Sequence, residues 1–161
     1  MKSNHHNKKS SARLFAVQIL FEMEINGKKI NNILERLTDE YLIEISRLNK
    51  TEKADKSHLI KILKGVIKNQ KDIDLNIKDN LIGWSLSRID SVSRAILRSA
   101  FYELRECNDI PVRVIINEYI EISKFYSTPK SNGFINGILD RIFEDFKQEG
   151  KLVKRGRGLI N

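Results

Sequence analysis

The chain has 161 residues, of which 40% are hydrophobic and 31% charged, so the composition supports a folded core and excludes a disordered chain. Its single cysteine, Cys107, excludes an intrachain disulfide and a cysteine-based zinc cluster. No apolar run approaches the roughly 18 residues of a membrane helix, and the N-terminus lacks a secretory pattern. We therefore expect a cytoplasmic protein without a membrane partner.

The net charge of +8 is confined to the two ends of the chain. Residues 1–13 hold four basic and no acidic side chains, residues 147–161 hold five basic and one acidic, and the body between them is neutral. A neutral body with basic ends favours a polyanion, RNA or DNA ahead of a membrane surface, although basic tails can also serve solubility alone. We expect residues 1–9 to form a mobile basic arm and residues 149–161 a basic C-terminal tail.

Helical periodicity dominates the region between the ends, and only two prolines occur, so we predict an all-α fold. The expected helices cover about 10–25, 30–48, 55–70, the first part of 71–90, 91–107, 111–126 and 131–148. These seven helices would form one domain over 10–148, with two tightly packed helical subdomains over about 10–70 and 71–148.

Two of the helices have features that predict a central position. The first contains "LFAVQILF", which is apolar on nearly every side, with Gln18 as its one polar residue. The helix over 91–107 is apolar around much of its circumference, and Asp90 or Ser91 can cap it by accepting an unpaired backbone N–H. Trp84, in the irregular segment before that helix, is expected to lie in the core.

Residues 127–140 read "STPKSNGFINGILD" and contain two Asn-Gly pairs, which are typical of hairpin turns. A hairpin needs alternating strands on both sides, and neither flank alternates. The apolar side chains instead share one helical stripe: Ile135, Ile138, Leu139, Ile142 and Phe146. The segment therefore predicts the start of the last helix.

On that helix Gly133 and Gly137 fall opposite the apolar stripe and should face outward. Lys130, Phe134 and Arg141 share the same polar side. A basic group beside an aromatic ring suits single-stranded nucleic acid, because the charge meets phosphate and the ring stacks on a base. The alternative is that Phe134 folds back against the preceding helix as peripheral core.

Arg94, Arg98 and Arg105 lie on one stripe of the helix over 91–107 and could bind phosphate. Arginines in an apolar helix more often pair with carboxylates, and we favour that reading. Three acidic side chains are available nearby in the sequence: Glu103, Glu118 and Glu121.

Nothing in the sequence indicates catalysis. His5 and His6 are adjacent in the arm and His58 stands alone, so no pair has metal-ligand spacing on a helix. We find no Gly-rich phosphate loop and no nucleophile elbow. No carboxylate has an apolar sequence context that would raise its pKa. We expect no metal, no cofactor and no enzymatic activity.

Four segments together resemble the bacterial transcription antitermination factors of the NusB family: "SARLFAVQILF" (11–21), "WSLSRIDSVSRAILRSAFYEL" (84–104), "PVRVIINEYIEISKFY" (111–126) and "KSNGFINGILD" (130–140). The resemblance implies an all-α fold of seven helices in two subdomains and a role without catalysis. It also implies binding to the boxA element of nascent RNA together with NusE, a ribosomal protein, and assembly with other Nus factors on RNA polymerase. It leaves monomer and homodimer both open.

Carried over to this sequence, the resemblance implies RNA contacts on the arm, the first helix and the start of the last helix. The residues concerned are Lys8, Lys9, Arg13, Gln18, Lys130, Ser131 and Phe134, to which helical spacing adds Arg141. Gln18 is equally open to a buried structural role. The NusE contact is expected near Phe21, Ser93 and Arg94.

The chain departs from the family pattern at several points. Lysines replace the usual arginines of the arm, Ser93 stands where an acidic residue is common, and Tyr119 replaces a usual small residue. Two alternative functions are an RNA-binding domain of the kind found ahead of ribosomal RNA cytosine methyltransferases, and a helical scaffold that binds only protein.

Overall fold

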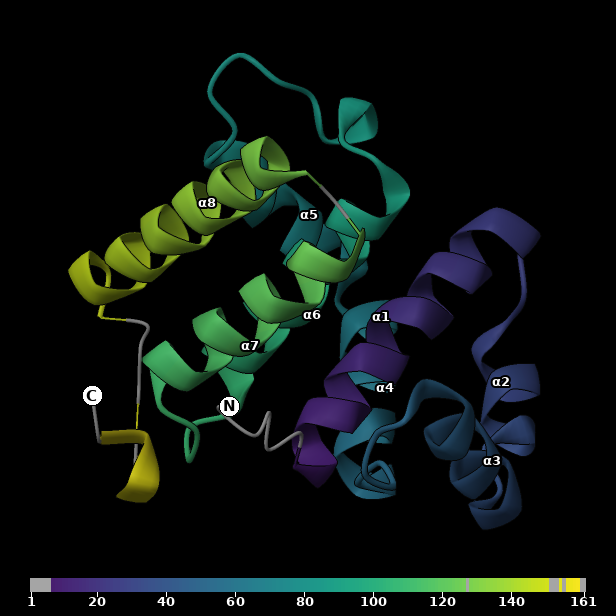
Figure 1. The fold of residues 1–161 in the computed structure, drawn as a ribbon. Helices are drawn as coiled ribbons and strands as arrows, with labels where there is room; N and C mark the ends of the chain where they lie inside the picture. The colour runs from purple at the N-terminus through teal and green to yellow at the C-terminus, as the bar shows by residue number, and fades with distance from the viewer. Residues whose placement is uncertain (1–6, 127, 151–153, 155, 160–161) are drawn as a thin grey trace.

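The computed structural model describes residues 7–126, 128–150, 154 and 156–159, which contain helices and no strand (Figure 1). The elements follow in the order α1 (Lys8–Asn26), α2 (Ile30–Arg36), α3 (Asp39–Asn49), α4 (Lys56–Lys68), α5 (Gln70–Asp79), η1 (Leu86–Arg88), α6 (Ser91–Glu106), α7 (Val112–Tyr126), α8 (Pro129–Gln148) and η2 (Gly156–Leu159), where η marks a short 3-10 helix. The predicted all-α fold is confirmed. Within these residues, no helix is long and apolar enough to cross a membrane.

The helix predicted over about 30–48 is two helices, α2 and α3, which makes the expected count of seven one short. The chain leaves the helical conformation at Leu37 (ψ 58°) and Thr38 (ψ 162°). Thr38 then caps α3, because its hydroxyl accepts the backbone N–H of Tyr41 at 3.2 Å. Apolar spacing continues across the break, so periodicity alone does not reveal it.

Capping residues fix the other helix ends close to their predicted positions. Gly27 takes a left-handed conformation (φ 65°) and ends α1 at Asn26, one residue beyond the predicted end. Asp90 caps α6 by accepting the N–H of Ser93. Thr128 caps α8 and Pro129 occupies its first position, so α8 begins two residues earlier than expected.

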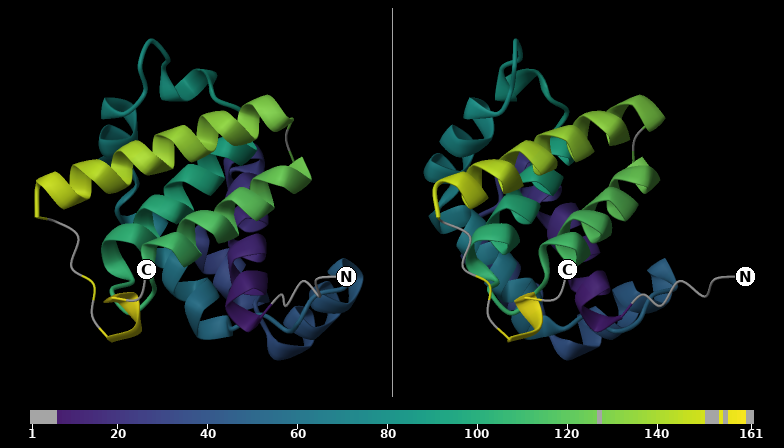
Figure 2. Two further views of the ribbon diagram at one scale, coloured as in Figure 1. Left: turned by 60° about the vertical axis from the view of Figure 1, so that its left-hand side comes forward. Right: turned by 90° about the vertical axis from the view of Figure 1, so that its left-hand side faces the viewer.

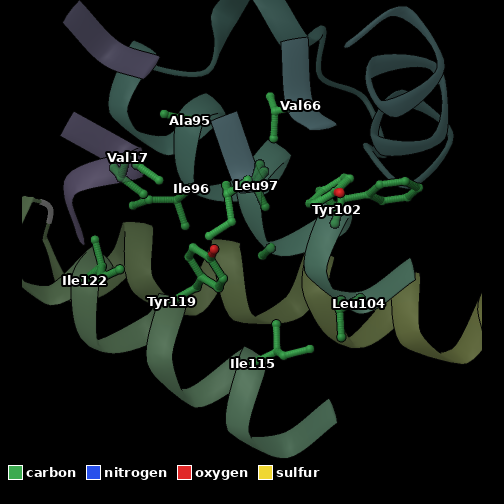
Figure 3. Close-up of a cluster of buried hydrophobic side chains, with 14 of the residues drawn as sticks. Val17, Val66, Ala95, Ile96, Leu97, Tyr102, Leu104, Ile115, Tyr119 and Ile122 are labelled. Carbon is green, nitrogen blue, oxygen red and sulfur yellow. The ribbon is translucent and has the colours of Figure 1, made fainter. Parts of the chain in front are cut away.

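The predicted central helix is α6, which packs against α1, α4, α5, α7 and α8 (Figures 1 and 2). On one side α7 and α8 pack against each other and against α6, and on another α1 and α4 do the same. Figure 3 shows side chains from several of these helices meeting in the core, among them Val17, Val66, Leu97, Ile115 and Ile122.

The described part of the C-terminal tail contacts the turn between α6 and α7. Lys154 Nζ donates to the carbonyl oxygen of Cys107 at 3.0 Å. The backbone of Gly158 lies so close to the same turn that a Cβ there would stand 2.1 Å from the carbonyl oxygen of Asn108. This approach requires glycine, so these residues of the tail are attached to the helical body.

Candidate nucleic-acid interface

The two Asn-Gly pairs lie within the first turns of α8, as the helical spacing predicted. No atom outside the helix lies within 4 Å of the position that a Cβ would take at Gly133 or Gly137. The predicted outward glycine face is therefore confirmed. Each glycine costs about 0.8–1 kcal/mol relative to alanine in a helix interior, and no packing contact compensates for that cost.

A hollow of about 230 Å³ lies between the start of α8, the segment before α6 and the first turn of α6. Its lining combines two aromatic rings with basic and hydroxyl groups: Trp84, Arg88, Ile89, Asp90, Ser93, Lys130, Ser131 and Phe134. The structure thus brings together Lys130, Ser131 and Phe134, three of the predicted RNA contacts. Lys130 is exposed, and among the described residues it forms no ion pair.

The aromatic side chains of the hollow were only partly anticipated. Phe134 is half-buried and packs on the core, but its ring also lies 6.3 Å from the ring of Trp84, centre to centre, at 59°. Trp84 is 57% exposed, so the prediction that it belongs to the core is wrong. The segment over 80–90 lacks periodicity, which left sequence reasoning with only the general tendency of tryptophan to be buried.

Two further predicted contacts, Gln18 and Arg141, are engaged within the protein. Gln18 is half-buried, and its Nε2 donates to the hydroxyl of Tyr126 at 2.8 Å, which ties α1 to the end of α7. Arg141 is exposed, but its Nη2 donates to the carbonyl oxygen of Asn80 at 2.9 Å, at the end of α5. Neither side chain lines the hollow.

Residues 1–6 of the predicted arm lie outside the described residues, and Lys8 and Lys9 form the first turn of α1. Lys8 is exposed and Lys9 half-buried. The hydroxyl of Ser10 donates to Glu118 at 2.7 Å, so α1 begins beside the middle of α7. Tyr126, where α7 ends, is about 12 Å further along that helix at 1.5 Å per residue. The two lysines therefore lie near the middle of α7, whereas the hollow lies near the end of α7, where α8 begins.

Arg13, one of the predicted RNA contacts, is buried and offers no surface to a ligand in this structure. Its guanidinium donates hydrogen bonds to Glu103 of α6, with Nε 2.9 Å from Oε2 and Nη2 3.1 Å from Oε1. His58 Nε2 lies 2.8 Å from the same carboxylate, and the hydroxyl of Tyr119 donates to it. Glu118 adds a second, weaker ion pair to Arg13 at 3.6 Å. Four helices thus meet at one buried carboxylate.

The surroundings of Glu103 keep it ionised. Burial alone would raise the pKa of Glu103, but the hydrogen bond from His58 and the charge of Arg13 outweigh burial and lower the pKa to about 2. Burial and the negative charge of Glu103 raise the pKa of Tyr119 well above its usual value. Glu103 is fully buried, but its pKa is lowered, so it does not contradict the prediction that no carboxylate has an apolar context that raises its pKa. It serves as a structural counter-ion.

Glu103 also belongs to the only grouping of potential metal ligands among the described residues, with His58 and Cys107. Their ligand atoms lie within 4.8 Å of one another. Both oxygens of Glu103 already accept hydrogen bonds, and the adjacent guanidinium of Arg13 opposes a further cation. Burial raises the pKa of the Cys107 thiol to about 11, which disfavours the thiolate that a metal needs. The grouping is therefore part of the polar core.

Of the residues expected at a protein partner, only Phe21 offers an open surface, with 37% of the residue exposed. Ser93, also predicted as a partner contact, is buried, and its hydroxyl donates to Asp90 at 2.7 Å. Arg94 is largely covered and forms an ion pair with Glu24 at the end of α1. It connects α1 to the segment before α6.

The three arginines of the α6 stripe pair with carboxylates, which is the interpretation that we favoured over phosphate binding. Arg98 binds Asp74 of α5 in a two-pronged contact at 2.8 and 3.0 Å, and Arg105 pairs with Asp72. The partners are nevertheless different from those expected, because they come from α1 and α5, with Glu106 of α6 as a further partner of Arg105. Sequence spacing within α6 and α7 could not identify the partners on α1 and α5.

Comparison with known proteins extends this picture. Residues 10–144 match the NusB family. The chain is 40% identical to a transcription antitermination protein NusB of Mesorhizobium japonicum, covering 91% of this chain and 96% of the relative. It is 36% identical to a NusB of Caulobacter vibrioides, covering 90% and 98%.

Solved structures agree in fold. A T. maritima NusB structure superposes with a TM-score of 0.73 at 36% identity, covering 86% of this chain and 92% of the other. A structure described as antitermination factors NusB and NusE in complex with dsRNA superposes at 0.69, with 21% identity over 86% of this chain and 97% of the other. At that identity the second likeness supports the fold alone.

Fold and surface together define a small all-helical protein of the antitermination-factor type, with an aromatic and basic hollow at the start of its last helix. The family match covers most of the described residues and includes every helix that lines the hollow. The chain belongs to the NusB family.

Proposed function

We propose that this protein is a transcription antitermination factor that binds boxA-type single-stranded RNA. It would act in the cytoplasm, without catalysis, together with NusE, other Nus factors and RNA polymerase. Family membership supports the general role, and a structural neighbour of the same fold is described in complex with NusE and dsRNA. The observation that carries the RNA contact is the hollow, where Lys130 and the ring of Phe134 lie side by side on an exposed surface.

The RNA would extend from the start of α1 to the hollow. Lys8 and Lys9 at one end and Lys130 at the other supply charges for the phosphates, with Tyr126 between them at the end of α7. Arg13 contributes indirectly, because its ion pair with Glu103 positions α1 against α6. Phe21 at the far end of α1 remains our candidate for the protein partner.

The alternative of a domain from a ribosomal RNA methyltransferase fits less well. The alignment covers 98% of the Caulobacter relative, which is itself named as a transcription antitermination protein. A protein-only scaffold does not require an exposed lysine beside an aromatic ring at the hollow. The RNA titration decides between this alternative and the proposed function.

The test is a titration of the protein with a boxA-like RNA oligonucleotide at several salt concentrations, with and without NusE. Lys130→Ala should weaken binding and reduce the slope of log K against log salt by about 0.7, the value for one phosphate contact on a single strand. Lys64→Ala, which changes an exposed lysine of α4 that does not line the hollow, is the matched control and should leave the affinity and the salt slope unchanged. Absence of binding at low salt, or binding that NusE does not strengthen, would contradict the proposal.

A further inference from the structure

One wall of the hollow consists of residues that are not among the RNA contacts implied by the family resemblance. Trp84 and Arg88 come from the irregular segment between α5 and α6, facing Phe134 and Lys130 at the start of α8. Trp84 leaves more than half of its surface in water, and it is the single tryptophan of the chain. A large aromatic ring held at an open surface beside positive charge is typical of a stacking site for a nucleobase.

The segment that carries Trp84 is held in place by Arg94. The guanidinium of Arg94 donates to the carbonyl oxygens of Ser87 at 3.3 Å and Leu86 at 3.4 Å, and also to that of Ile89. Ile89 is buried below the segment. Because the backbone two to five residues after Trp84 is bonded in this way without a ligand, this part of the wall adds little ordering cost on binding.

The geometry of the two rings leaves the tryptophan accessible. At 6.3 Å and a tilt of 59°, Phe134 meets Trp84 obliquely and does not cover it as a parallel stacked ring would. The hollow of about 230 Å³ is smaller than the roughly 300–1,000 Å³ of sites for drug-sized ligands. A space of this size suits one planar ring system.

The charges at the rim fit a nucleotide chain that enters and leaves the hollow. Arg88 is exposed, and among the described residues it forms no ion pair, as is also true of Lys130 on the opposite wall. Asp90 is the one acid of the lining, and both of its oxygens accept hydrogen bonds from Ser93. The lining therefore holds two basic groups against one carboxylate, and its net charge is positive.

From these observations we propose that the hollow is a pocket for a single unpaired nucleobase of the RNA. The base stacks on Trp84 and is braced by Phe134, while Arg88 and Lys130 bind the phosphates on either side. The inference rests on the proposed RNA-binding function and adds Trp84 and Arg88 as residues that select unpaired over paired RNA. A paired base cannot enter, because its partner strand would have to separate first.

The fluorescence of Trp84 provides a direct test, since it reports on the hollow alone. Titration with the boxA-like single-stranded RNA should quench it, whereas the same RNA in duplex form at equal concentration should not. Trp84→Ala should weaken single-strand binding about 5- to 150-fold, the range for losing one base–aromatic stack, and Trp84→Phe should recover part of it. Ile82→Ala removes an even more exposed apolar side chain from the same segment and is the control, with unchanged affinity.

The outcomes separate this inference from the proposed function. If Lys130→Ala weakens binding and Trp84→Ala does not, the protein binds RNA but the base pocket is wrong. If no variant and no wild-type protein binds RNA, the proposed function itself fails. If NusE alone quenches the fluorescence of Trp84 and RNA does not, a protein segment occupies the hollow and the inference is overturned. An Arg88→Ala variant whose salt slope equals that of the wild type would remove Arg88 from the phosphate contacts.

Discussion

Replacing Glu103 by glutamine tests the polar centre that holds α1, α4, α6 and α7 together. The carboxylate is fully buried and accepts hydrogen bonds from Arg13, His58 and Tyr119. Glutamine keeps the shape but removes the charge, and its amide N–H₂ would replace one acceptor with a donor facing other donors. The buried guanidinium of Arg13 then loses its main counter-ion.

Two independent arguments give the size of the effect. Removing one partner of a buried ion pair costs about 3–5 kcal/mol. The pKa of Glu103 falls from 4.5 to about 2 on folding, which at 1.36 kcal/mol per pKa unit corresponds to about 3 kcal/mol of stability. For a chain of this length, a loss of 3–5 kcal/mol lowers Tm by about 6–20 °C.

Urea unfolding followed by helical circular dichroism measures the loss at pH 7. Because the folded pKa lies below the unfolded one, the stabilisation by Glu103 is complete above about pH 4.5 and disappears as the pH falls toward 2. The difference between wild type and Glu103→Gln should therefore shrink across this window. Glu106→Gln is the matched control, since Glu106 is a half-exposed partner of Arg105 on the same helix and should cost less than about 1 kcal/mol.

The reasoning is refuted if Glu103→Gln costs no more than Glu106→Gln, or if its deficit stays constant from pH 7 to pH 3. Either result would mean that Glu103 and the three groups that donate to it contribute little as an ionised network.

The remaining predictions concern two glycines that differ only in their surroundings. Gly65→Ala in α4 should cost about 1–3 kcal/mol, because a Cβ would stand 2.1 Å from the ring of Tyr102, which is buried. Gly137→Ala in α8 should instead stabilise the protein by about 0.8–1 kcal/mol, because its Cβ would meet open space. Thermal unfolding of both variants checks the signs, and shifts in the same direction would contradict the assignment of inward and outward faces.

The fold was largely predictable because its helices carry local signals. Apolar stripes locate them, and Asp90, Gly27 and Pro129 mark their ends. The missed break at Thr38 also had a local signal, a capping hydroxyl followed by Asp39 and Glu40 in the first turn of α3, where acidic groups are favoured. Continuous apolar spacing across the break outweighed that signal.

The polar centre around Glu103 could be predicted from the sequence only in part. Glu103 follows Ser99 and Ala100 on the buried face of α6, so its burial was accessible from helical spacing. Its pairing with Arg13 joins residues 90 positions apart, and no local pattern specifies it. Tyr119, where the resemblance led us to expect a small residue, supplies a hydroxyl to the same carboxylate. This departure is thus accommodated by the buried network.

The position of Arg13 changes how the RNA-binding surface should work. Its charge is used inside the protein, so the positive groups left for phosphates in the described residues of the proposed path are mainly lysines: Lys8, Lys9 and Lys130, with Arg88 at the rim of the hollow. A lysine ammonium attracts phosphate as a point charge and lacks the fixed fork of arginine. Such contacts strengthen binding to any RNA strand and fall with salt. Discrimination between unpaired and paired RNA must then arise where shape matters, at the aromatic rings of Trp84 and Phe134.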